Sequence, residues 1–503
     1  MDQPIPAPIP PDDSLGSQVR RAVIWRSGSQ IVAQSVQWAA TFLVIRILSP
    51  ADYGLFAMTQ VVLVLLNMLN GYGLASGLIR QSEVTPREVR QLFGMLLLLN
   101  GALAAGQALL APLASAYYRQ PIVAELLRAQ ALLYLATPFI VLPQALLGRA
   151  MDFRHQAKAN ICASIASATT ALGGALAGWG VWTLIAAPLA MFAVRAVVLT
   201  LAARSLVWPS FDFRGAGHLA RYGGVMAVGQ LTWFAQSQAD VFIAGRWFSP
   251  HVLGLYTTSL FLTQIFVSKF VPPLNEVAFT AYARMQDAPG QLANGFVRAV
   301  RIVMAAALPF YLGLFATAGP LVATVLGPKW IEAAPIVRLL ALAMPFMTLQ
   351  VMLTPACDAR GRPGIGVRNG AIGATILALA FLVGVRWGAQ GLATAWILAY
   401  PAYLAVSLHR SLPVIGTSLT VLAEAIAPPT LAAVAMALLV TIADGLLPAM
   451  PALPRLALLV AVGAASYAGW LVVFARPLLR EIAATVGRGP AVPPAPARVA
   501  ARA

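Results

Sequence analysis

The sequence is poor in charge. Only 10% of its 503 residues are Asp, Glu, Lys or Arg, whereas 59% are hydrophobic and the mean hydropathy is +0.78. A soluble protein carries roughly 25% charged residues, so this composition cannot supply a surface that water covers. The scarcity of charge excludes a soluble globular protein and predicts an integral membrane protein.

Residues that form disulfides or bind metals are also scarce. The two cysteines, Cys162 and Cys357, lie within apolar stretches, and the four histidines share no metal-ligand spacing. We therefore expect no disulfide framework, no metal site and no cofactor. Hydrophilic segments long enough to fold outside the membrane are missing too. Membrane-bound glycosyltransferases, polymerases and ligases need such a segment for catalysis, so we expect no enzymatic activity.

Acidic residues are the rarer charged type, with 17 Asp and Glu against 34 Lys and Arg, which gives a net charge of +17. In a soluble protein this excess would suggest a nucleic-acid partner. No basic patch interleaved with aromatic residues occurs here, and basic residues collect in the cytoplasmic loops of membrane proteins. We therefore expect no nucleic-acid partner.

Long apolar runs dominate what is present. A membrane-spanning helix needs about 20 mostly apolar residues, and the ten-residue alternation of a membrane β-barrel does not occur. The predicted fold class is an all-α polytopic membrane protein with about 14 transmembrane helices. The spans are expected at roughly 24–46, 54–79, 91–116, 122–147, 157–179, 181–203, 219–245, 253–280, 294–319, 333–357, 364–386, 389–409, 416–443 and 456–476.

The basic residues set the orientation. An even number of spans puts both termini on one side, and 24 of the 34 Lys and Arg residues then fall on that side, with six on the other and four within spans. Because basic residues favour the cytoplasmic side, we predict that both termini are cytoplasmic. The proline-rich ends, 1–19 and 481–503, are predicted to be disordered tails.

One short sequence occurs twice, as RILSPADYGLF at 46–56 and RWFSPHVLGLY at 246–256. Residues 21–55 and 221–255 share nine identities without a gap, and the pair Trp179-Gly180 returns as Trp387-Gly388. We predict two parallel six-helix repeats around a central cavity, an N-lobe at 20–205 and a C-lobe at 206–410, followed by two extra helices at 411–480. Parallel repeats are typical of alternating-access transporters. The Ser-Pro pair in each copy predicts the capped start of the next helix.

The chain resembles the polysaccharide transporter family over roughly residues 20–480. The resemblance is carried by RILSPADYGLF, GLASGLIRQ, LLGRAMDFR, QADVFIAG, SPHVLGLY and GPKWIEAAPIVRLLALAMPF. The members are oligosaccharide flippases of the multidrug/oligosaccharidyl-lipid/polysaccharide flippase superfamily. The resemblance implies a flippase in the bacterial inner membrane that moves undecaprenyl-diphosphate-linked oligosaccharide from the cytoplasmic to the periplasmic leaflet. The product would be an exopolysaccharide, a capsule or the O-antigen of lipopolysaccharide. The partners implied are this lipid-linked oligosaccharide, membrane lipids and a polysaccharide polymerase or chain-length machinery.

A diphosphate cargo requires cations in a wet cavity, because a charge within the membrane normally faces a cavity or a partner. Arg grips a phosphate through paired donors, and Lys acts as a point charge. Alternatively, Arg128 and Arg338 snorkel to the interface, and Arg26 serves topology alone. The candidate cavity cations are Lys269, Arg195, Arg338, Arg128 and Arg26.

Asp240 is the sharpest difference between the repeats, because its counterpart is Ala40. A carboxylate within a span predicts either coupling of transport to H+ or Na+ or an ion pair with a cation such as Lys269. Glu276 is a second candidate for this charge network, since it lies seven residues after Lys269 on the predicted helix.

Gln30 and Gln230 recur at equivalent positions of the two repeats. We predict that they are polar cavity residues that bind sugar hydroxyls or each other, and the alternative is interhelical packing.

Two other functions fit the same architecture. A multidrug or cation exporter would favour twelve spans and an acid-rich cavity. A peptidoglycan lipid-precursor flippase would need a denser basic cluster in the first span than Arg26 supplies. Fourteen predicted spans with four cations inside them favour the oligosaccharide flippase.

Overall fold

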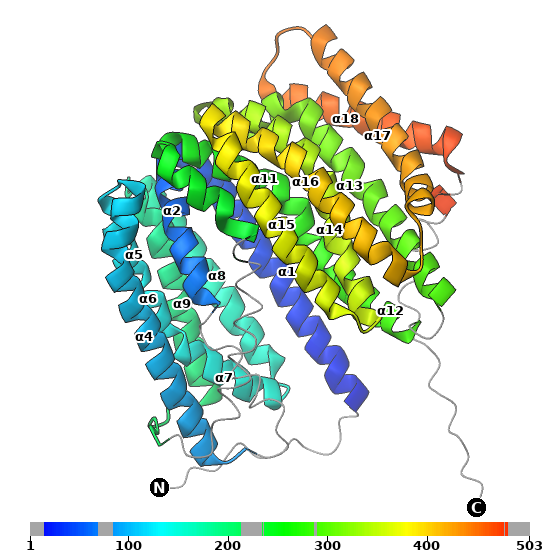
Figure 1. Ribbon diagram of the computed structural model, residues 1–503. Helices are drawn as coiled ribbons and strands as arrows, with labels where there is room; N and C mark the ends of the chain where they lie inside the picture. Colours follow the sequence, from blue (N-terminus) through cyan, green and yellow to red (C-terminus); the bar gives the residue numbers. More distant parts are fainter. Residues whose placement is uncertain are drawn as a thin grey trace, which may run out of the picture. The chain divides into compact units, whose positions relative to one another are not determined.

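The computed structural model describes residues 15–68, 84–212, 234, 236–285, 289–476 and 478–480. Within these ranges the fold is helical, without strands, and two of its elements are short 3-10 helices, η1 (Pro328–Ala333) and η2 (Val385–Trp387) (Figure 1). A helical segment at 236–247 precedes α11. The α-helices are α1 (Leu15–Ile47), α2 (Pro50–Asn67), α4 (Pro86–Tyr118), α5 (Ile122–Gln130), α6 (Leu132–Ala136), α7 (Pro138–Arg149), α8 (Phe153–Leu176), α9 (Trp182–Ala203), α11 (Pro250–Lys269), α12 (Val271–Arg284), α13 (Pro289–Val325), α14 (Ala334–Ala359), α15 (Pro363–Gly384), α16 (Gly388–Ile415), α17 (Leu419–Leu446) and α18 (Ala452–Phe474).

Eleven helical stretches in the described part of the chain are long and apolar enough to cross a membrane. One of them, Pro363–Ile415, covers the two spans expected at 364–386 and 389–409. The first expected span coincides with α1, whose apolar part is Val32–Ile47, and most of the seventh, 219–245, lies outside the described residues. The prediction of an all-α, multi-pass membrane protein is confirmed.

The chain forms two compact units, and both are assembled from separate stretches of sequence. The first contains Met1–Leu262, Val322–Ile336 and Val367–Tyr403, and the second contains Thr263–Leu321, Val337–Gly366 and Leu404–Ala503. The lobe boundaries at 20–205 and 206–410 stay a prediction.

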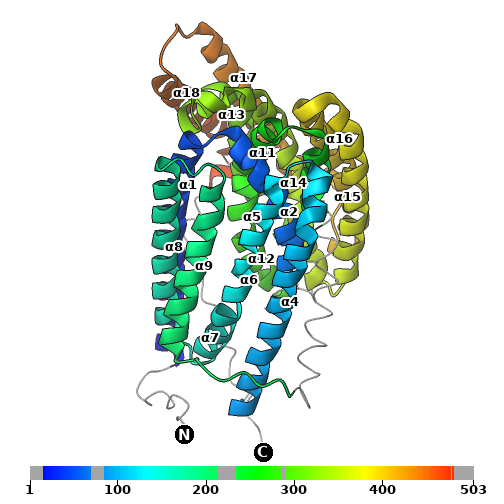
Figure 2. The same ribbon diagram turned by 90° about the vertical axis from the view of Figure 1, so that its left-hand side faces the viewer.

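In the first unit, α1 packs along α8, and α8 packs along α9, as Figure 2 shows. Val44 of α1 and Leu48, which directly follows that helix, meet Ala171 and Ala175 of α8 in one buried cluster. Small residues let membrane helices approach closely, and the dispersion contacts made at this short distance stabilise the helix pair.

In the second unit, α17 and α18 form a helical hairpin whose core includes Met436, Val440 and Leu459. Arg455 closes the hairpin, because its Nε donates to an Asp444 carboxylate oxygen at 2.6 Å and its Nη2 donates to the Asp444 carbonyl oxygen at 2.8 Å. These two helices cover most of the ranges 416–443 and 456–476, in which spans are expected.

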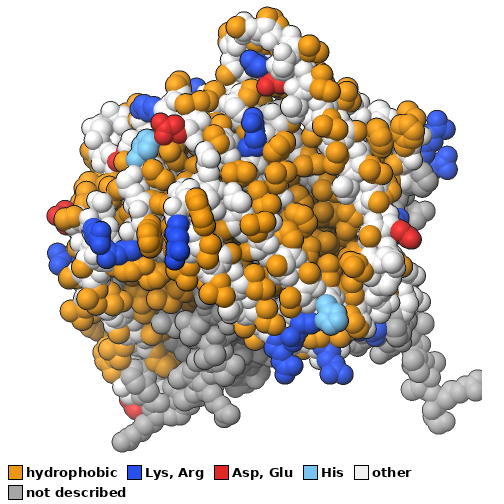
Figure 3. Space-filling view, turned by 45° about the horizontal axis from the view of Figure 1, so that its top comes forward, with side chains coloured by type: hydrophobic (Ala, Val, Ile, Leu, Met, Phe, Trp, Pro, Cys, Tyr) orange, Lys and Arg blue, Asp and Glu red, His pale blue; other side chains and the backbone are white. Residues whose placement is uncertain are grey.

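Large apolar side chains lie on the surface as well as in the core. Examples are Leu109 on α4, Leu446 on α17 and Phe474 on α18, which are 77%, 80% and 70% exposed. Figure 3 shows one face on which hydrophobic side chains predominate and charged ones are few. Hydrocarbon chains of lipid are the environment that such a surface requires.

Candidate functional site

The duplicated Ser-Pro motif starts a helix in both copies. Ser49 caps α2, since it accepts from the Asp52 N–H at 3.3 Å while its own N–H donates to the Asp52 carboxylate at 2.9 Å. Pro50 takes the first helical position, where a missing N–H costs nothing. In the second copy α11 begins at Pro250, and Ser249 Oγ accepts from the Val252 N–H at 3.4 Å. The predicted role of the Ser-Pro pair is confirmed.

The two copies of this motif touch each other. A Cβ atom placed on Gly54 would lie 1.8 Å from the Pro250 carbonyl oxygen, and one placed on Gly254 would lie 1.7 Å from the Pro50 carbonyl oxygen. The first turns of α2 and α11 therefore meet backbone to backbone, in a reciprocal contact that only glycine permits. This contact explains why glycine recurs at both positions.

The recurring arginines reach across in a similar way. Arg246 donates from Nη1 to the Tyr117 carbonyl oxygen at 2.8 Å, at the end of α4, and lies 5.7 Å from the centre of the Tyr117 ring. Arg46 lies beside Gly327, just after α13, with its Nε 3.8 Å from where a Cβ on that glycine would stand. Each arginine of the duplicated motif thus lies at the end of a helix distant in sequence, α4 or α13, where carbonyl groups favour a cation.

A second contact joins the end of α1 to the segment after α13. The Trp330 indole N–H donates to the Ile45 carbonyl oxygen at 2.9 Å, and Lys329 Nζ donates to the Ile47 carbonyl oxygen at 3.0 Å. Trp330 is fully buried and packs edge to face on Tyr53, with 5.5 Å between ring centres. The donors satisfy carbonyl groups that the end of a helix leaves unpaired.

The Trp-Gly turns form another matching pair. Gly180 and Gly388 both have positive φ, 55° and 73°, a backbone conformation that favours glycine. Each turn precedes a membrane helix, α9 and α16 respectively.

Asp240 lies at the centre of a buried polar network in the first unit. Its side chain is 1% exposed and accepts a hydrogen bond from the Tyr256 hydroxyl at 2.7 Å. The Trp396 indole N–H donates to that same hydroxyl at 2.7 Å. Trp396 stacks on Tyr400, with ring centres 5.1 Å apart, and Tyr400 hydrogen-bonds with Gln236. We call Asp240, Tyr256, Trp396, Tyr400 and Gln236 the Asp240 network.

The counterparts of this network in the first repeat are apolar. Asp240 and Tyr256 correspond to Ala40 and Phe56, displaced by 200 residues. At the displacement of 208 set by the Trp-Gly turns, the positions of Trp396 and Tyr400 are occupied by Pro188 and Phe192. Sequence reasoning found Asp240 and missed its partners, although the same comparison of repeats carries the signal at position 256.

The predicted cations lie in different surroundings. Arg195 on α9 is half-buried, and its Nε is buried without a hydrogen-bond partner. Arg128 on α5 and Lys269 at the end of α11 are exposed. Arg338 on α14 is exposed and lies 5.9 Å from the Phe315 ring centre.

The remaining predicted residues are not brought together in the described part of the chain. Glu276 is exposed on α12, and Gln30 is exposed on α1. Gln230 and the side chain of Arg26 lie outside what the structure describes. The continuous helix assumed for Lys269 and Glu276 is interrupted at Phe270, because Pro272 and Pro273 offer no N–H to extend it.

Sequence relatives of the chain are named for the biosynthesis or transport of polysaccharides. The succinoglycan biosynthesis transport protein ExoT of Rhizobium meliloti is 25% identical over 330 residues, which cover 66% of this chain and 67% of that protein. The teichuronic acid biosynthesis protein TuaB of Bacillus subtilis is 23% identical and covers 90% and 95%. The lipopolysaccharide biosynthesis protein WzxC of Escherichia coli is 21% identical and covers 80% and 83%.

Two solved structures share the fold. The lipid II flippase MurJ in its inward closed conformation matches with a TM-score of 0.73 at 12% identity, over 92% of this chain and all of MurJ. An inward-facing multidrug resistance transporter of the MATE family and the MOP superfamily matches with a TM-score of 0.57 at 15% identity, over 79% and 99%.

The family model described as "Polysaccharide biosynthesis protein" matches residues 43–335. The chain belongs to this family of polysaccharide biosynthesis proteins and has the helical fold of membrane transporters.

Proposed function

We propose that the protein is a flippase that carries undecaprenyl-diphosphate-linked oligosaccharide from the cytoplasmic to the periplasmic leaflet of a bacterial inner membrane. The observation that carries the proposal is family membership together with the transporter fold. The relatives are named for succinoglycan, teichuronic acid and lipopolysaccharide. These polymers differ, but their synthesis can share one kind of cargo. That cargo is a lipid-linked repeat unit, which must cross the membrane before polymerisation.

The cargo combines a doubly anionic diphosphate with a hydrated sugar chain, so the transport path needs a cation that is shielded from bulk water. Among the predicted cations whose side chains are described, Arg195 fits best, because it is half-buried and its Nε has no hydrogen-bond partner. A guanidinium can hold a phosphate through paired donors. We propose that Arg195 binds the diphosphate. Alternating access of the predicted lobes then moves the cargo across the membrane.

Asp240 is the proposed coupling residue. A fully buried carboxylate is costly, and the side-chain donor that Asp240 contacts is the neutral hydroxyl of Tyr256. Binding a proton or Na+ there would remove that cost, and release would restore it. Binding and release of the ion change the free energy of the buried carboxylate. Such a carboxylate can therefore link an ion gradient to a change between two conformations.

The fold likeness to MurJ favours one alternative, a flippase for the peptidoglycan lipid precursor. The likeness to the MATE transporter favours another, a multidrug exporter. Neither alternative accounts for the relatives named for polysaccharides. An enzymatic activity has no support among the relatives, which are named as transport or biosynthesis proteins.

Complementation separates these functions. The wild-type chain is expressed in three strains, one lacking an oligosaccharide flippase, one depleted of MurJ and one lacking its drug exporters. We expect surface polysaccharide to return in the first strain and no rescue in the other two. Rescue of MurJ depletion or of drug resistance, with no polysaccharide in the first strain, would refute the proposal.

A further inference from the structure

A short non-helical segment, residues 205–212, is fastened along α4. It follows α9, which ends at Ala203, and Arg204 turns the chain with a positive φ of 48°. In Figure 2 the segment runs from the lower end of α9 past α7 toward the lower end of α4. We call residues 205–212 the strap.

Backbone and side-chain bonds hold the strap in place. The Ser210 N–H donates to the Arg90 carbonyl oxygen at 2.9 Å, and Arg90 Nε donates to the Trp208 carbonyl oxygen at 3.0 Å. A Cβ on Gly94 would lie 2.2 Å from the Ser210 carbonyl oxygen. The glycine therefore allows the strap to lie directly on the backbone of α4.

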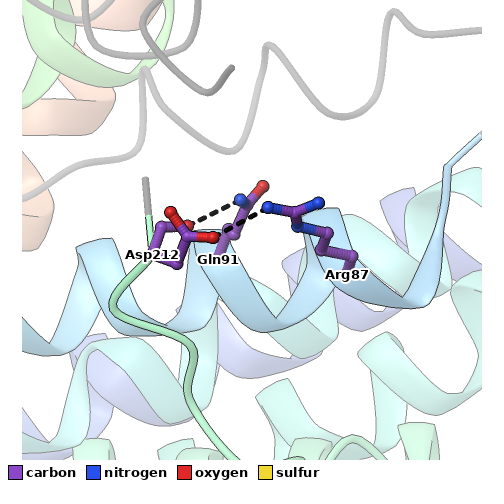
Figure 4. A network of polar contacts seen from close by, with 3 residues as sticks. All are labelled: Arg87, Gln91 and Asp212. Carbon is purple, nitrogen blue, oxygen red and sulfur yellow. Dashed lines mark hydrogen bonds and ion pairs between the residues drawn. The ribbon is translucent and has the colours of Figure 1, made fainter. Parts of the chain in front are cut away.

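The end of the strap is fixed by a pair of α4 side chains, shown in Figure 4. Gln91 Nε2 donates to the Asp212 carbonyl oxygen at 2.6 Å, and Arg87 Nη2 lies 2.8 Å from an Asp212 carboxylate oxygen. The ion pair is more than half exposed, so it contributes little stability by itself. Together with the backbone bonds it sets the direction in which the strap faces.

The strap has an inner and an outer side. Ser205 is 4% exposed, and Val207 packs on the buried cluster that includes Leu92. Leu206 and Trp208 alternate with them, as extended backbone requires, and are 78% and 83% exposed. Phe211 adds a third outer apolar side chain at 56% exposure. Burying a large apolar side chain contributes about 1.5–3 kcal/mol, so water is a poor environment for the outer side.

We propose that the strap lies in the headgroup layer of the bilayer, with Leu206, Trp208 and Phe211 inserted among the lipids. Two membrane spans set its depth, because it begins two residues after the span Trp182–Ala203 and rests on the first turns of the span Pro86–Tyr118. Tryptophan is enriched at this boundary.

The charge around the strap completes the argument for lipid as the occupant. Arg87 is 64% exposed, Arg90 is exposed, and Arg204 precedes the strap directly. Basic residues at the membrane surface attract anionic headgroups. The strap is therefore an interfacial anchor for the connection that leaves α9. This role requires that the chain spans a membrane and does not depend on which cargo it carries.

Spin labels test the depth of the strap. The full chain with Cys162→Ser and Cys357→Ser receives one cysteine, Leu206→Cys, Trp208→Cys or Phe211→Cys, and is placed in nanodiscs of phosphatidylethanolamine and phosphatidylglycerol. Leu109→Cys, on the apolar surface of α4, serves as the lipid-exposed reference. Power saturation then compares the accessibility of each label to oxygen and to a water-soluble nickel chelate. Only variants that elute as folded protein are measured.

We expect oxygen accessibility to exceed nickel accessibility at all three strap positions, by less than at position 109. Greater nickel accessibility would place the strap in water and overturn the proposal. Low accessibility to both reagents would mean that protein covers the strap, which would also overturn it. Nanodiscs of phosphatidylcholine alone lack anionic headgroups, so the excess of oxygen accessibility is expected to decrease in them. An unchanged excess would show that the arginines do not hold the strap through anionic headgroups.

Discussion

Asp240 is the residue at which the two repeats diverge in chemistry. The first repeat has Ala40 there, and the apolar pair Ala40 and Phe56 has become the hydrogen-bonded pair Asp240 and Tyr256. Burying a carboxylate without a hydrogen-bond donor is costly. The hydroxyl of Tyr256 supplies that donor, which Phe56 lacks.

Substitutions at position 240 separate coupling from stability. Asp240→Asn keeps an acceptor for the Tyr256 hydroxyl, so we expect little loss of stability but loss of ion-driven transport. Asp240→Ala leaves that buried hydroxyl without its acceptor, which costs about 1–3 kcal/mol. Thermal unfolding in detergent and flipping in proteoliposomes with an imposed gradient measure the two effects. Gradient-driven transport by Asp240→Asn at the wild-type rate would contradict the coupling role.

Arg195 and Arg128 form a matched pair, since the first is half-buried and the second is exposed. A hydrogen bond to a charged group contributes about 1.5–3 kcal/mol, so Arg195→Gln is expected to weaken diphosphate-lipid binding roughly tenfold to a hundredfold. Arg195→Lys should recover part of this, because lysine keeps the charge and loses the paired donors. Binding of an undecaprenyl diphosphate measures the change. Equal effects of Arg195→Gln and Arg128→Gln would contradict the assignment.

At the scale of helices, the crossing of α2 and α11 brings two backbones into direct contact in the first unit. Its geometry rests on Gly54 and Gly254, each pressed against a proline carbonyl oxygen of the other copy. Arg246 on Tyr117 and Trp330 on Ile45 fasten neighbouring helix ends. The two copies of the loop thus contact each other, which accounts for the glycine that both of them carry.

Adding one methyl group tests this crossing. Gly54→Ala or Gly254→Ala must push the helices apart, and overpacking of this kind costs about 1–3 kcal/mol. The control is Gly101→Ala on α4, where a Cβ meets nothing within 4 Å and where alanine stabilises a helix by about 0.8–1.0 kcal/mol relative to glycine. Thermal unfolding should therefore move in opposite directions for the two kinds of variant. A shift of the same sign in all three would contradict the close crossing.

At the scale of the whole molecule, the distribution of basic residues predicts how the chain is threaded. The segments expected in the cytoplasm hold 24 Lys and Arg, against six expected outside. The structure adds helices of sufficient length, eleven stretches in its described part.

Labelling in intact cells tests this threading. In the background without Cys162 and Cys357, Arg119→Cys lies in a loop predicted to be periplasmic, and Ala150→Cys lies in one predicted to be cytoplasmic. A membrane-impermeant maleimide should label the first in intact cells and the second only after lysis. The reverse pattern would invert the orientation, and labelling of both in intact cells would contradict the intervening span.

The sequence by itself determined the fold class and the membrane setting. These follow from composition and from local signals such as Ser49-Pro50, whose capping depends only on neighbouring residues. It also identified Asp240, because the comparison of repeats needs no coordinates. Tertiary structure alone decided which side chains meet: Tyr256 at Asp240, Trp396 at Tyr256, Arg246 at Tyr117, and the strap on Gly94. The physical reason is that helical periodicity records which face of a helix is apolar, whereas the partners of a side chain on other helices are set by how the helices pack.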